Sequence, residues 1–533
     1  MNKNKLNEQC FLFASNKENP QVFFQGYCFI GSDYISGSEG QKDFYNKTGK
    51  RINGSEDGCY IYAERINNDY LFSTDFLGYK KVFYYWTDDM WVVSNSIQLI
   101  ADYLKENKIS LKANFSQLSA IGIHKGSFFN QLYSVNTFIE GVKLLPAGCT
   151  LKISKSECSI ERIKRLNVFS SYEEGLSLFI GTWTARLQGL LESNIHIISD
   201  LTGGADSRAV FTLLKKAKDL SLSGSDYPML SCGSSKGNTL DLEIARDIAG
   251  CYEYPINVRR QHIENKYSGQ ESYESWKALC LGVYHPIYFP PHGPQNGTVS
   301  LGGSGAGNHR RVYKHESIEE LVSSHVSMIK PNWLSYNVRS DIEAEIHRMS
   351  LIGSKVDPMV LHFREYRDRM HGGRNPQYMT LFNPLGSKIL DEVSEVSGSS
   401  RFKVGQVNYD IMSNLLPEIL GIPFDSDLKA LTTERKRNLV LLDKLDRIST
   451  GKAYTSTDIS LAQEPLKKTS SAIEFLNEDF QVARAKVFVK DFFGKEFINK
   501  TDNTMKLALE HKMFNHAIDG QGVAAMIAAS IFD

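Results

Sequence analysis

A short apolar run leads directly into two glycines and then into a helical pattern in the middle of this chain. Residues 195–198 are typical of a buried strand, Gly203 and Gly204 of a tight turn, and residues 207–218 of a helix. A strand, a glycine turn and a helix in this order open a parallel α/β domain. The segment therefore predicts that residues 172–533 fold around a parallel sheet and end in a helical part.

The first 160 residues follow a different pattern. Short runs rich in aromatic and β-branched residues alternate with turn residues such as Asn53-Gly54 and Asp88-Asp89. The predicted strands are 22–30, 59–63, 70–74, 82–86, 91–93 and 150–153. They predict an α+β sandwich over residues 1–160, followed by a charged linker at 157–165. The helices expected after it include 172–193, 361–370 and 434–446.

Charge and composition limit the partners of the chain. Its 533 residues are too many for one core. Lys+Arg and Asp+Glu each total 61, which leaves no electrostatic signature for nucleic acid or for an anionic membrane. No apolar run approaches the roughly 18 residues of a membrane span, and the N-terminus lacks a signal-peptide core. We expect a cytoplasmic protein whose partner is a small molecule or a protein, with a homodimer left open.

The eight cysteines are scattered through the chain without a CxxC pair. This spacing does not match a zinc site or the disulfide framework of a small secreted domain. The cysteines are therefore expected to be buried thiols in a reducing compartment.

The turn after the predicted strand has the groups that a phosphate needs. Gly203 and Gly204 let backbone N–H groups approach a ligand closely, and the helix N-terminus adds partial positive charge. Thr202 and Ser207 add hydroxyl donors. Asp206, a carboxylate beside a phosphate, requires a cation, for which Mg²⁺ is the obvious bridge. On glycine spacing alone, an ordinary βα turn with an Asp or Ser cap is the more frequent explanation.

The order of residues from Thr202 to Ser207, Thr-Gly-Gly-x-Asp-Ser, resembles the Ser-Gly-Gly-x-Asp-Ser pyrophosphatase loop of asparagine synthetases and their relatives. It is not a Walker A loop, because no Gly-Lys-Ser/Thr follows. Four other segments are similar to that family in the same order along the chain. They are 75–85 with 93–96, the turn at 141–148, the helical pattern at 240–249 and residues 382–391.

The resemblance implies a class II amidotransferase fold joined to an ATP-pyrophosphatase domain. Members bind ATP and Mg²⁺, convert a carboxylate to an acyl-adenylate with release of pyrophosphate, and let ammonia or an amine attack it. The candidate nucleotide contacts here are Thr202, Gly203, Gly204, Asp206, Ser207, Cys232, Gly303 and Arg310. Asp206 is also the candidate metal ligand.

The glutaminase half departs from the family pattern. Working members place a Cys directly after the initiator Met, whereas this chain has Asn2. Cys10 lies too far along to be terminal without processing, and a structural thiol is the simpler interpretation. β-Lactam synthetases and lasso-peptide cyclases likewise lack this cysteine and use an amine of the substrate. We therefore expect no glutamine hydrolysis.

A second departure concerns the loop at 301–310. The family has Ser-Gly-Glu/Asp-Gly-x-Asp-Glu there, whereas this chain keeps the glycines and loses every carboxylate. The alignment puts Ser304 at the catalytic acidic position, Gly307 at the metal Asp and Asn308 at the final Glu. Three explanations stay open. The metal shifts to Asp206 and phosphate oxygens, Arg310 or its neighbour at 311 clamps the phosphates, or the domain binds nucleotide without catalysis.

The catalytic lysine of the family has two candidates, Lys429 first and Lys436 second, each of which is otherwise a solvated lysine. Glu365 is a candidate base, although its spacing to Arg369 suits an i,i+4 ion pair.

The sequence thus predicts an ATP-dependent ligase that joins a carboxylate to an amine or ammonia in specialised-metabolite or surface-glycan biosynthesis. Its substrates would be small molecules, a peptide or a glycan. The alternative is a non-catalytic family member that binds nucleotide or a partner. An adenylating enzyme of tRNA modification is disfavoured by the neutral charge and the lack of CxxC.

Overall fold

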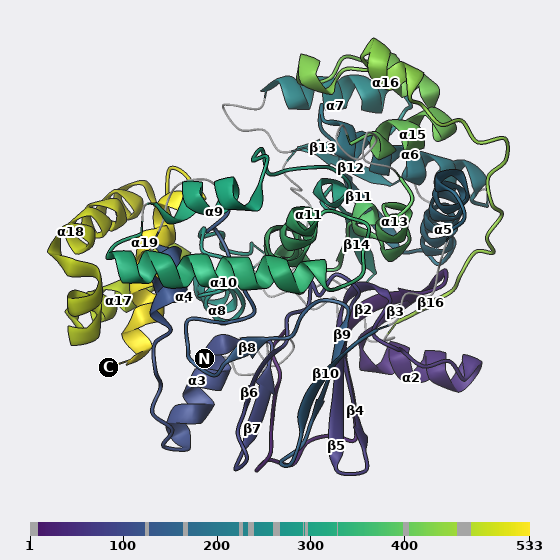
Figure 1. The fold of residues 1–533 in the computed structure, drawn as a ribbon. Coiled ribbons are helices and arrows are strands. Elements are labelled where there is room, and N and C mark those ends of the chain that lie inside the picture. The colour runs from purple at the N-terminus through teal and green to yellow at the C-terminus, as the bar shows by residue number, and fades with distance from the viewer. Residues whose placement is uncertain are drawn as a thin grey trace.

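The structure, a computed structural model, describes residues 9–122, 127–163, 169–222, 228–232, 239–258, 267–291, 293, 297–327, 329–397, 405–455 and 471–532. Within these ranges the strands form three sheets, two of them mainly antiparallel and one parallel (Figure 1). The predicted mixed class, with parallel and antiparallel sheets and a helical C-terminal part, is confirmed at this level.

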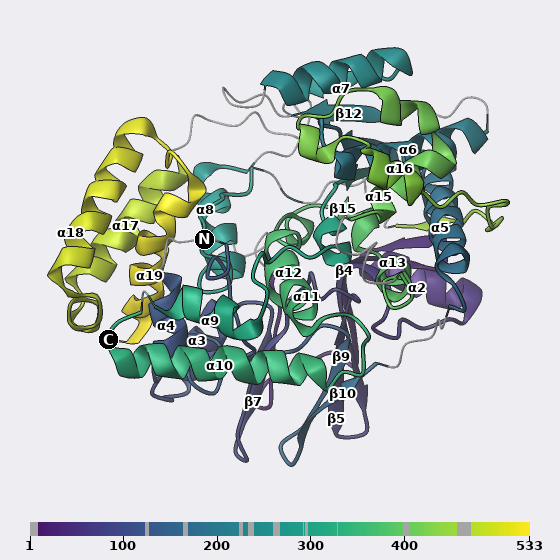
Figure 2. The ribbon, with the colours of Figure 1, turned by 45° about the horizontal axis from the view of Figure 1, so that its top comes forward.

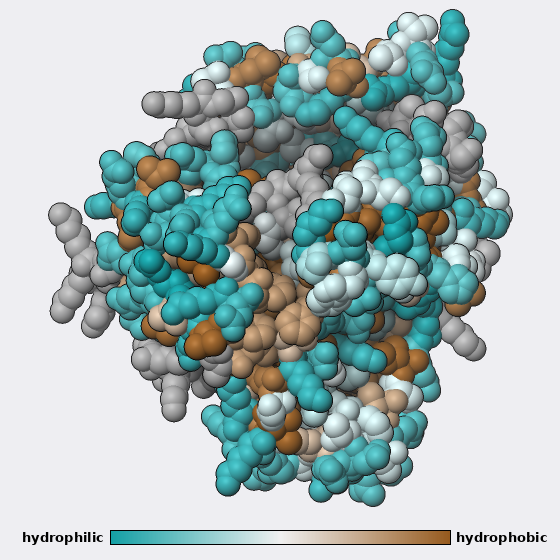
Figure 3. All heavy atoms as spheres, turned by 60° about the vertical axis from the view of Figure 1, so that its left-hand side comes forward, coloured by the Kyte–Doolittle hydropathy of each residue, from teal (hydrophilic) through white to brown (hydrophobic). Residues whose placement is uncertain are grey.

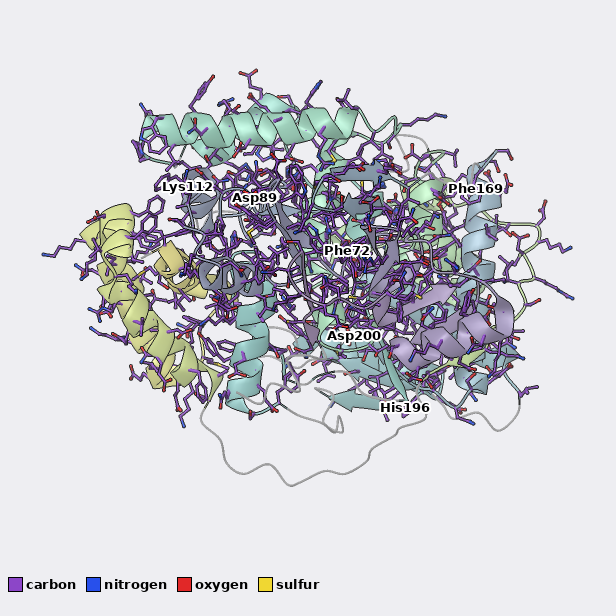
Figure 4. The ribbon with its side chains drawn as sticks, turned by 90° about the horizontal axis from the view of Figure 1, so that it is seen from below. Phe72, Asp89, Lys112, Phe169, His196 and Asp200 are labelled. Carbon is purple, nitrogen blue, oxygen red and sulfur yellow. The ribbon has the colours of Figure 1, made fainter. Side chains whose placement is uncertain are left out.

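Two sheets of the N-terminal part face each other. The first has the order β1-β7-β6-β8, with β1 Leu12–Ala14, β7 Trp91–Ser94, β6 Phe83–Trp86 and β8 Lys143–Leu144. The second has the order β10-β9-β5-β4-β2-β3-β16, with bounds Cys158–Arg162, Cys149–Ile153, Asp69–Thr74, Asp57–Ile66, Val22–Ile30, Asp33–Ser36 and Ala453–Tyr454. Phe13 and Val93 of the first sheet pack against Phe72 of the second, and Figure 4 shows Phe72 inside the molecule. The sandwich therefore forms where alternating aromatic and β-branched residues predicted strands.

The parallel sheet has the order β13-β12-β11-β14-β15. Its strands are Ile256–Val258, Met229–Cys232, His196–Asp200, Thr298–Leu301 and Leu381–Phe382, and every neighbouring pair is parallel. The chain starts at the central β11, moves outward to β13, and returns to the other side of β11 with β14. The strand order reverses between β11 and β14. At such a switch point the carboxyl ends of the strands leave a crevice that suits a ligand.

Helices surround this sheet. They are α5 (Tyr172–Glu192), α6 (Ala205–Leu220), α7 (Thr239–Cys251), α13 (Lys388–Val393), α15 (Val407–Leu415) and α16 (Thr433–Arg437). Figures 1 and 2 show α6, α7, α15 and α16 gathered at the same end of the molecule. The loop that joins β11 to α6 contacts α7 through Asp241, and the first turn of α6 contacts α15 through Asn408.

The last three helices close a core that includes residues from the beginning of the chain. They are α17 (Ala472–Ala485), α18 (Val487–His511) and α19 (Gln521–Ala529), and α19 is buried along its whole length. They pack on α4 (Phe115–Ile121) and α8 (Gly269–Cys280), in one core with Phe83 and Ile100. Figure 3 turns these helices forward and shows a few apolar side chains among hydrophilic ones. No described helix has the length and apolar character needed to cross a bilayer.

The remaining helices are α2 (Gly37–Thr48), α3 (Ile97–Glu106), α9 (Ile318–Val326), α10 (Asn332–Ser350), α11 (Pro358–His362) and α12 (Arg369–His371). Between α11 and α12 the π-helical turn η2, Phe363–Asp368, continues the helix, so the predicted helix at 361–370 is confirmed.

Two predicted elements were wrong in part. The expected linker at 157–165 contains β10, which pairs antiparallel with β9; residues 164 and 165 lie outside the described ranges. The expected helix at 434–446 ends at Arg437. Beyond it the backbone N–H groups of Val440 and Leu442 donate to Asp410 and Asn414 of α15. Side chains of another helix thus replace the intrahelical hydrogen bonds.

Six of the cysteines are buried as expected, but Cys158 is half-buried and Cys251 is exposed; all eight are free thiols.

Candidate functional site

The turn at Thr202–Gly204 lies at the switch point of the parallel sheet, between β11 and α6. Helix α6 begins at Ala205, with Gly204 as its N-cap and no side-chain cap. The expected start near Asp206-Ser207 is therefore one to two residues too late, and both residues lie in the first helical turn. The Ser207 hydroxyl accepts a hydrogen bond from the Thr202 N–H at 3.0 Å, and the Thr202 hydroxyl accepts one from the Gly204 N–H at 3.1 Å. The loop is thus shaped by its own hydroxyls.

The Gly203 N–H already binds an anionic oxygen. It donates to Oδ1 of Asp241, on α7, at 2.9 Å. A Cβ on Gly203 would lie 2.7 Å from the Cβ of Asp425, so a side chain does not fit there. A phosphate that takes this N–H would replace the Asp241 carboxylate. The contact supports the use of this N–H as an anion donor.

Asp206 is held between an amide and a guanidinium. Its Oδ1 accepts a hydrogen bond from Nδ2 of Asn408, on α15, at 2.7 Å, and its Oδ2 lies 3.5 Å from Nη2 of Arg310. Burial raises the pKa of Asp206, while Arg310, Lys429 and the Asn408 hydrogen bond act in the opposite direction. Arg310 and Lys429 therefore stabilise the charged form of this carboxylate.

The loop after β14 packs directly on the N-terminus of α6. A Cβ on Gly303 would lie 3.1 Å from the backbone nitrogen of Ser207 and 3.4 Å from the Cβ of Asp206. Gly305 has φ +94° and a backbone so close to Gly386 that a Cβ would overlap it. The glycines retained in this loop therefore allow its backbone to pack closely on the start of α6 and on Gly386.

The 3₁₀ turn η1, Ala306–His309, fixes the rest of this loop. The His309 ring contacts the Leu385 carbonyl at 2.7 Å and the Ser394 hydroxyl at 2.8 Å. Burial lowers the pKa of His309 to about 3, so the ring is neutral at ordinary pH.

The Asn308 side chain is directed toward η2. Its Nδ2 donates to Oδ2 of Asp368, on η2, at 3.0 Å, and its carbonyl oxygen accepts from Nε and Nη2 of Arg364 at 2.9 and 2.7 Å. Asp368 also accepts from the Tyr79 hydroxyl at 3.2 Å, and its burial raises its pKa. A carboxylate does lie behind this loop, but it is Asp368 of the helix predicted at 361–370, where the sequence interpretation had singled out Glu365.

The two candidate lysines differ in position. Lys429 ends the 3₁₀ turn η6, Asp427–Lys429, and its Nζ lies 2.6 Å from Oδ2 of Asp425. The same Nζ is 3.7 Å from the position of a Cβ on Gly204, and the side chain is 45% exposed. Lys436 is an exposed residue of α16. The structure brings Lys429 to the turn.

Three other candidates lie outside the Thr202–Ser207 turn. Glu365 is buried, forms an ion pair with Arg369 at 2.5 Å and accepts from the Ala147 N–H at 3.0 Å. This is the i,i+4 pair that the spacing suggested. Ser304 is half-buried beside Gly372. Cys232 ends β12, and burial, followed by Asp241, raises its pKa to about 11.

Arg208 is a functional candidate that the sequence interpretation missed. It is fully buried, donates from Nη1 to the Ile422 carbonyl at 2.8 Å and lies 4.0 Å from the centre of the Phe424 ring. It fixes the segment that carries Asp425 and Lys429 over the turn. Arg208 could have been identified from the sequence, because it is an arginine on the apolar face of a predicted helix, where a buried charge needs a specific partner.

No three His, Cys, Asp or Glu side chains are placed to hold a metal within the described ranges. Asp206 is the carboxylate best placed to meet a cation, and Arg310 already shares it.

Searches for related proteins gave no match to a family model and none to a curated protein. Among solved structures, the U34-tRNA thiolase NcsA from Methanococcus maripaludis aligns at 13% identity with a TM-score of 0.19, over 52% of this chain and 90% of its own. The glutamine phosphoribosylpyrophosphate amidotransferase from B. subtilis, complexed with ADP and GMP, aligns at 10% identity with a TM-score of 0.16, over 65% and 76%. At these values neither likeness bears on the fold or the activity of this chain.

Proposed function

We propose that this chain is an ATP-dependent ligase of the asparagine-synthetase type that adenylates a carboxylate and joins it to an amine or ammonia without hydrolysing glutamine. The observation that carries the proposal is the position of the Thr202–Ser207 turn. It lies at the switch point of a parallel sheet, opens a helix, and has Asp206, Arg310 and Lys429 around it. A phosphate group suits each of these features.

The proposed reaction has two steps. A carboxylate oxygen attacks the α-phosphorus of ATP, and the bond to the β-phosphate oxygen breaks, which releases pyrophosphate. An amine nitrogen then attacks the acyl carbon, loses a proton and expels AMP. In the first step the N–H groups at the start of α6 would hold phosphate oxygens, and Arg310 and Lys429 would offset the charge that develops on the pyrophosphate.

Mg²⁺ supplies charge neutralisation at the phosphates in enzymes of this chemistry. The donor set here fits an ion that arrives with the nucleotide and finds Asp206 as its protein ligand. It does not fit a cage of several carboxylates, because the described residues offer no such group. The chain's own contribution to charge neutralisation would therefore come mainly from its basic residues.

The proposed substrate class rests on the resemblance to asparagine synthetases and their relatives. The carboxylate would belong to a small molecule, a peptide or a glycan of specialised biosynthesis, and a cytoplasmic location would supply the ATP.

One observation favours the alternative of a nucleotide-binding protein without catalysis. The Gly203 N–H is bound by Asp241, and Asp206 is paired with Arg310, so the turn is closed by the chain's own groups. In this alternative, the protein would bind ATP weakly and would not cleave it.

Release of AMP and pyrophosphate across a panel of carboxylates, with and without added amines, tests the proposal. We expect pyrophosphate release with at least one carboxylate, and its loss by at least ~10²-fold in Asp206→Ala, by analogy with the removal of one transition-state contact. Equal pyrophosphate release by the wild type and Asp206→Ala would contradict the assignment of the site. ATP binding without turnover for any carboxylate would favour the alternative.

A further inference from the structure

A cavity lies between the N-terminal sandwich and the helices that follow the parallel sheet. Its volume is about 550 Å³, within the range of small-molecule sites. One wall comes from the loops around Phe76 and Gly148, and the other from α13 and the helix at 358–371. None of its lining residues belongs to the turn at Thr202–Ser207 or to residues 302–310. The cavity is therefore separate from the proposed nucleotide site.

Two carboxylates of the lining are already neutralised. Glu365 forms its ion pair with Arg369, and Asp391 lies 2.5 Å from Nη1 of Arg364. These pairs leave no free negative charge for a ligand to meet on that wall.

Lys388 lines the cavity with its charge uncompensated. The residue is only 9% exposed, and no described residue forms a hydrogen bond or an ion pair with its Nζ. The centre of the Phe76 ring lies 6.0 Å from Nζ. Arg162, at the cavity rim beside Gly148, adds a second cation. The stem of the Lys388 side chain is buried, and its ammonium faces the cavity, where an anion that enters can bind it with a charge-assisted hydrogen bond.

Most of the remaining lining residues are apolar. Leu77, Ile352 and Leu361 face the cavity together with Phe76. A ligand that matches both parts carries one anionic group and a short apolar body, because hydrophobic contact provides affinity while a single placed charge fixes orientation.

We propose that this cavity is a binding site for a small amphipathic anion, whose carboxylate or phosphate meets Lys388 and whose apolar part packs on Phe76, Leu77 and Ile352. The site does not depend on the proposed ligase activity.

Calorimetric titration of the full chain with hexanoate, hexyl phosphate, hexylamine and hexanol tests the charge requirement. The four probes share one apolar chain and differ in the head group. We expect one binding event for at least one anion, with affinity at least about tenfold above that of hexylamine and hexanol, as expected for one charge-assisted hydrogen bond. The stronger of the two anions identifies the head group. Equal affinity for hexylamine, or no binding of either anion, would overturn the proposal.

Three variants locate the site. Lys388→Met keeps the length of the side chain and should lose about tenfold in anion affinity, whereas Lys388→Arg should keep most of it. Ile352→Trp, at a half-buried position, should block all four probes. Lys444→Met, which removes an exposed lysine elsewhere, is the matched control and should bind as the wild type does. Thermal melting checks that each variant is folded. Unchanged anion affinity in folded Lys388→Met or Ile352→Trp would place the binding elsewhere and refute the site.

Discussion

The guanidinium Nη2 of Arg310 lies 3.5 Å from the Oδ2 of Asp206, so a cation from the loop after β14 meets the carboxylate at the start of α6. A ligase of the proposed type would have carboxylates in that loop and a metal ion between the two. Here the positive charge belongs to the protein itself. Arg310 is 44% exposed at its side chain and can turn toward a phosphate that enters the turn. Of the three explanations for the missing carboxylates, this geometry favours the arginine clamp.

Arg310→Ala should weaken ATP binding, by about tenfold if one charge-assisted contact is lost. Arg310→Lys should restore the affinity only in part, because an ammonium lacks the two parallel donors of a guanidinium. Titration of ATP with Mg²⁺ by calorimetry measures both changes. Arg311→Ala is the control, since Arg311 donates to the His315 carbonyl at 2.6 Å and should leave the affinity unchanged. Equal affinities in all four proteins would exclude Arg310 from the site.

Lys429→Met should reduce turnover far more than ATP affinity. Its Nζ reaches the turn beside Gly204, where it can meet charge that develops only as pyrophosphate leaves. Removal of one such contact costs about 10²- to 10³-fold in kcat. Lys436→Met, on the exposed face of α16, provides the matched control. Steady-state pyrophosphate release distinguishes them. A larger loss in Lys436→Met than in Lys429→Met would reverse the assignment.

The parts of the fold that the sequence predicted correctly are those with a local cause. Residues 22–30 form β2 with the predicted bounds, because nine residues rich in aromatic and β-branched side chains pair with β4 from Val22 to Phe29. The turn between β11 and α6 was predictable for the same reason, since an apolar strand and two glycines are adjacent in sequence.

The sequence predictions are wrong or incomplete where contacts with distant parts of the chain determine the local structure. The helix expected at 434–446 ends early because Asp410 and Asn414 accept its backbone donors. In the site, Asn408 and Asp241 approach Asp206 and Gly203 from helices that no sequence signal connects to the turn. The periodicity of apolar residues predicts where helices and strands lie in the sequence. It does not predict which polar side chains from different elements come into contact.

Cys10 should be unable to act as a nucleophile. It is buried, and burial raises its pKa to about 12, so the reactive thiolate is scarce at neutral pH. Cys10→Ala should therefore leave amide formation unchanged, and neither protein should release glutamate from glutamine. The exposed Cys251 provides a control for thiol labelling, which should modify it while Cys10 stays protected. Glutamate release that disappears in Cys10→Ala would contradict this prediction and would require N-terminal processing.

Asp75 should make the protein less stable as the pH rises from about 4 to about 6. The residue is buried in the N-terminal sandwich, where its carboxyl oxygens accept the backbone N–H groups of Tyr79 and Lys80 at 2.8 and 2.9 Å. Burial outweighs these hydrogen bonds and raises its pKa to about 6. In the unfolded chain the carboxyl ionises near pH 4, at about 3.9.

Between these two pKa values the folded chain holds a proton that the unfolded chain has released, so the free energy of unfolding falls as the pH increases. Asp75 contributes most to the free energy of unfolding below pH ~4, where it is protonated in both states. This contribution, about 3 kcal/mol, is lost in full above pH ~6. Denaturant titrations at several pH values measure the slope. Asp75→Asn should flatten it, although the loss of one acceptor lowers stability at every pH. Asp88→Asn, at an exposed turn, should keep the wild-type slope. If Asp75→Asn and the wild type showed the same slope, the burial of an ionisable carboxyl at this position would not govern the acid dependence of stability.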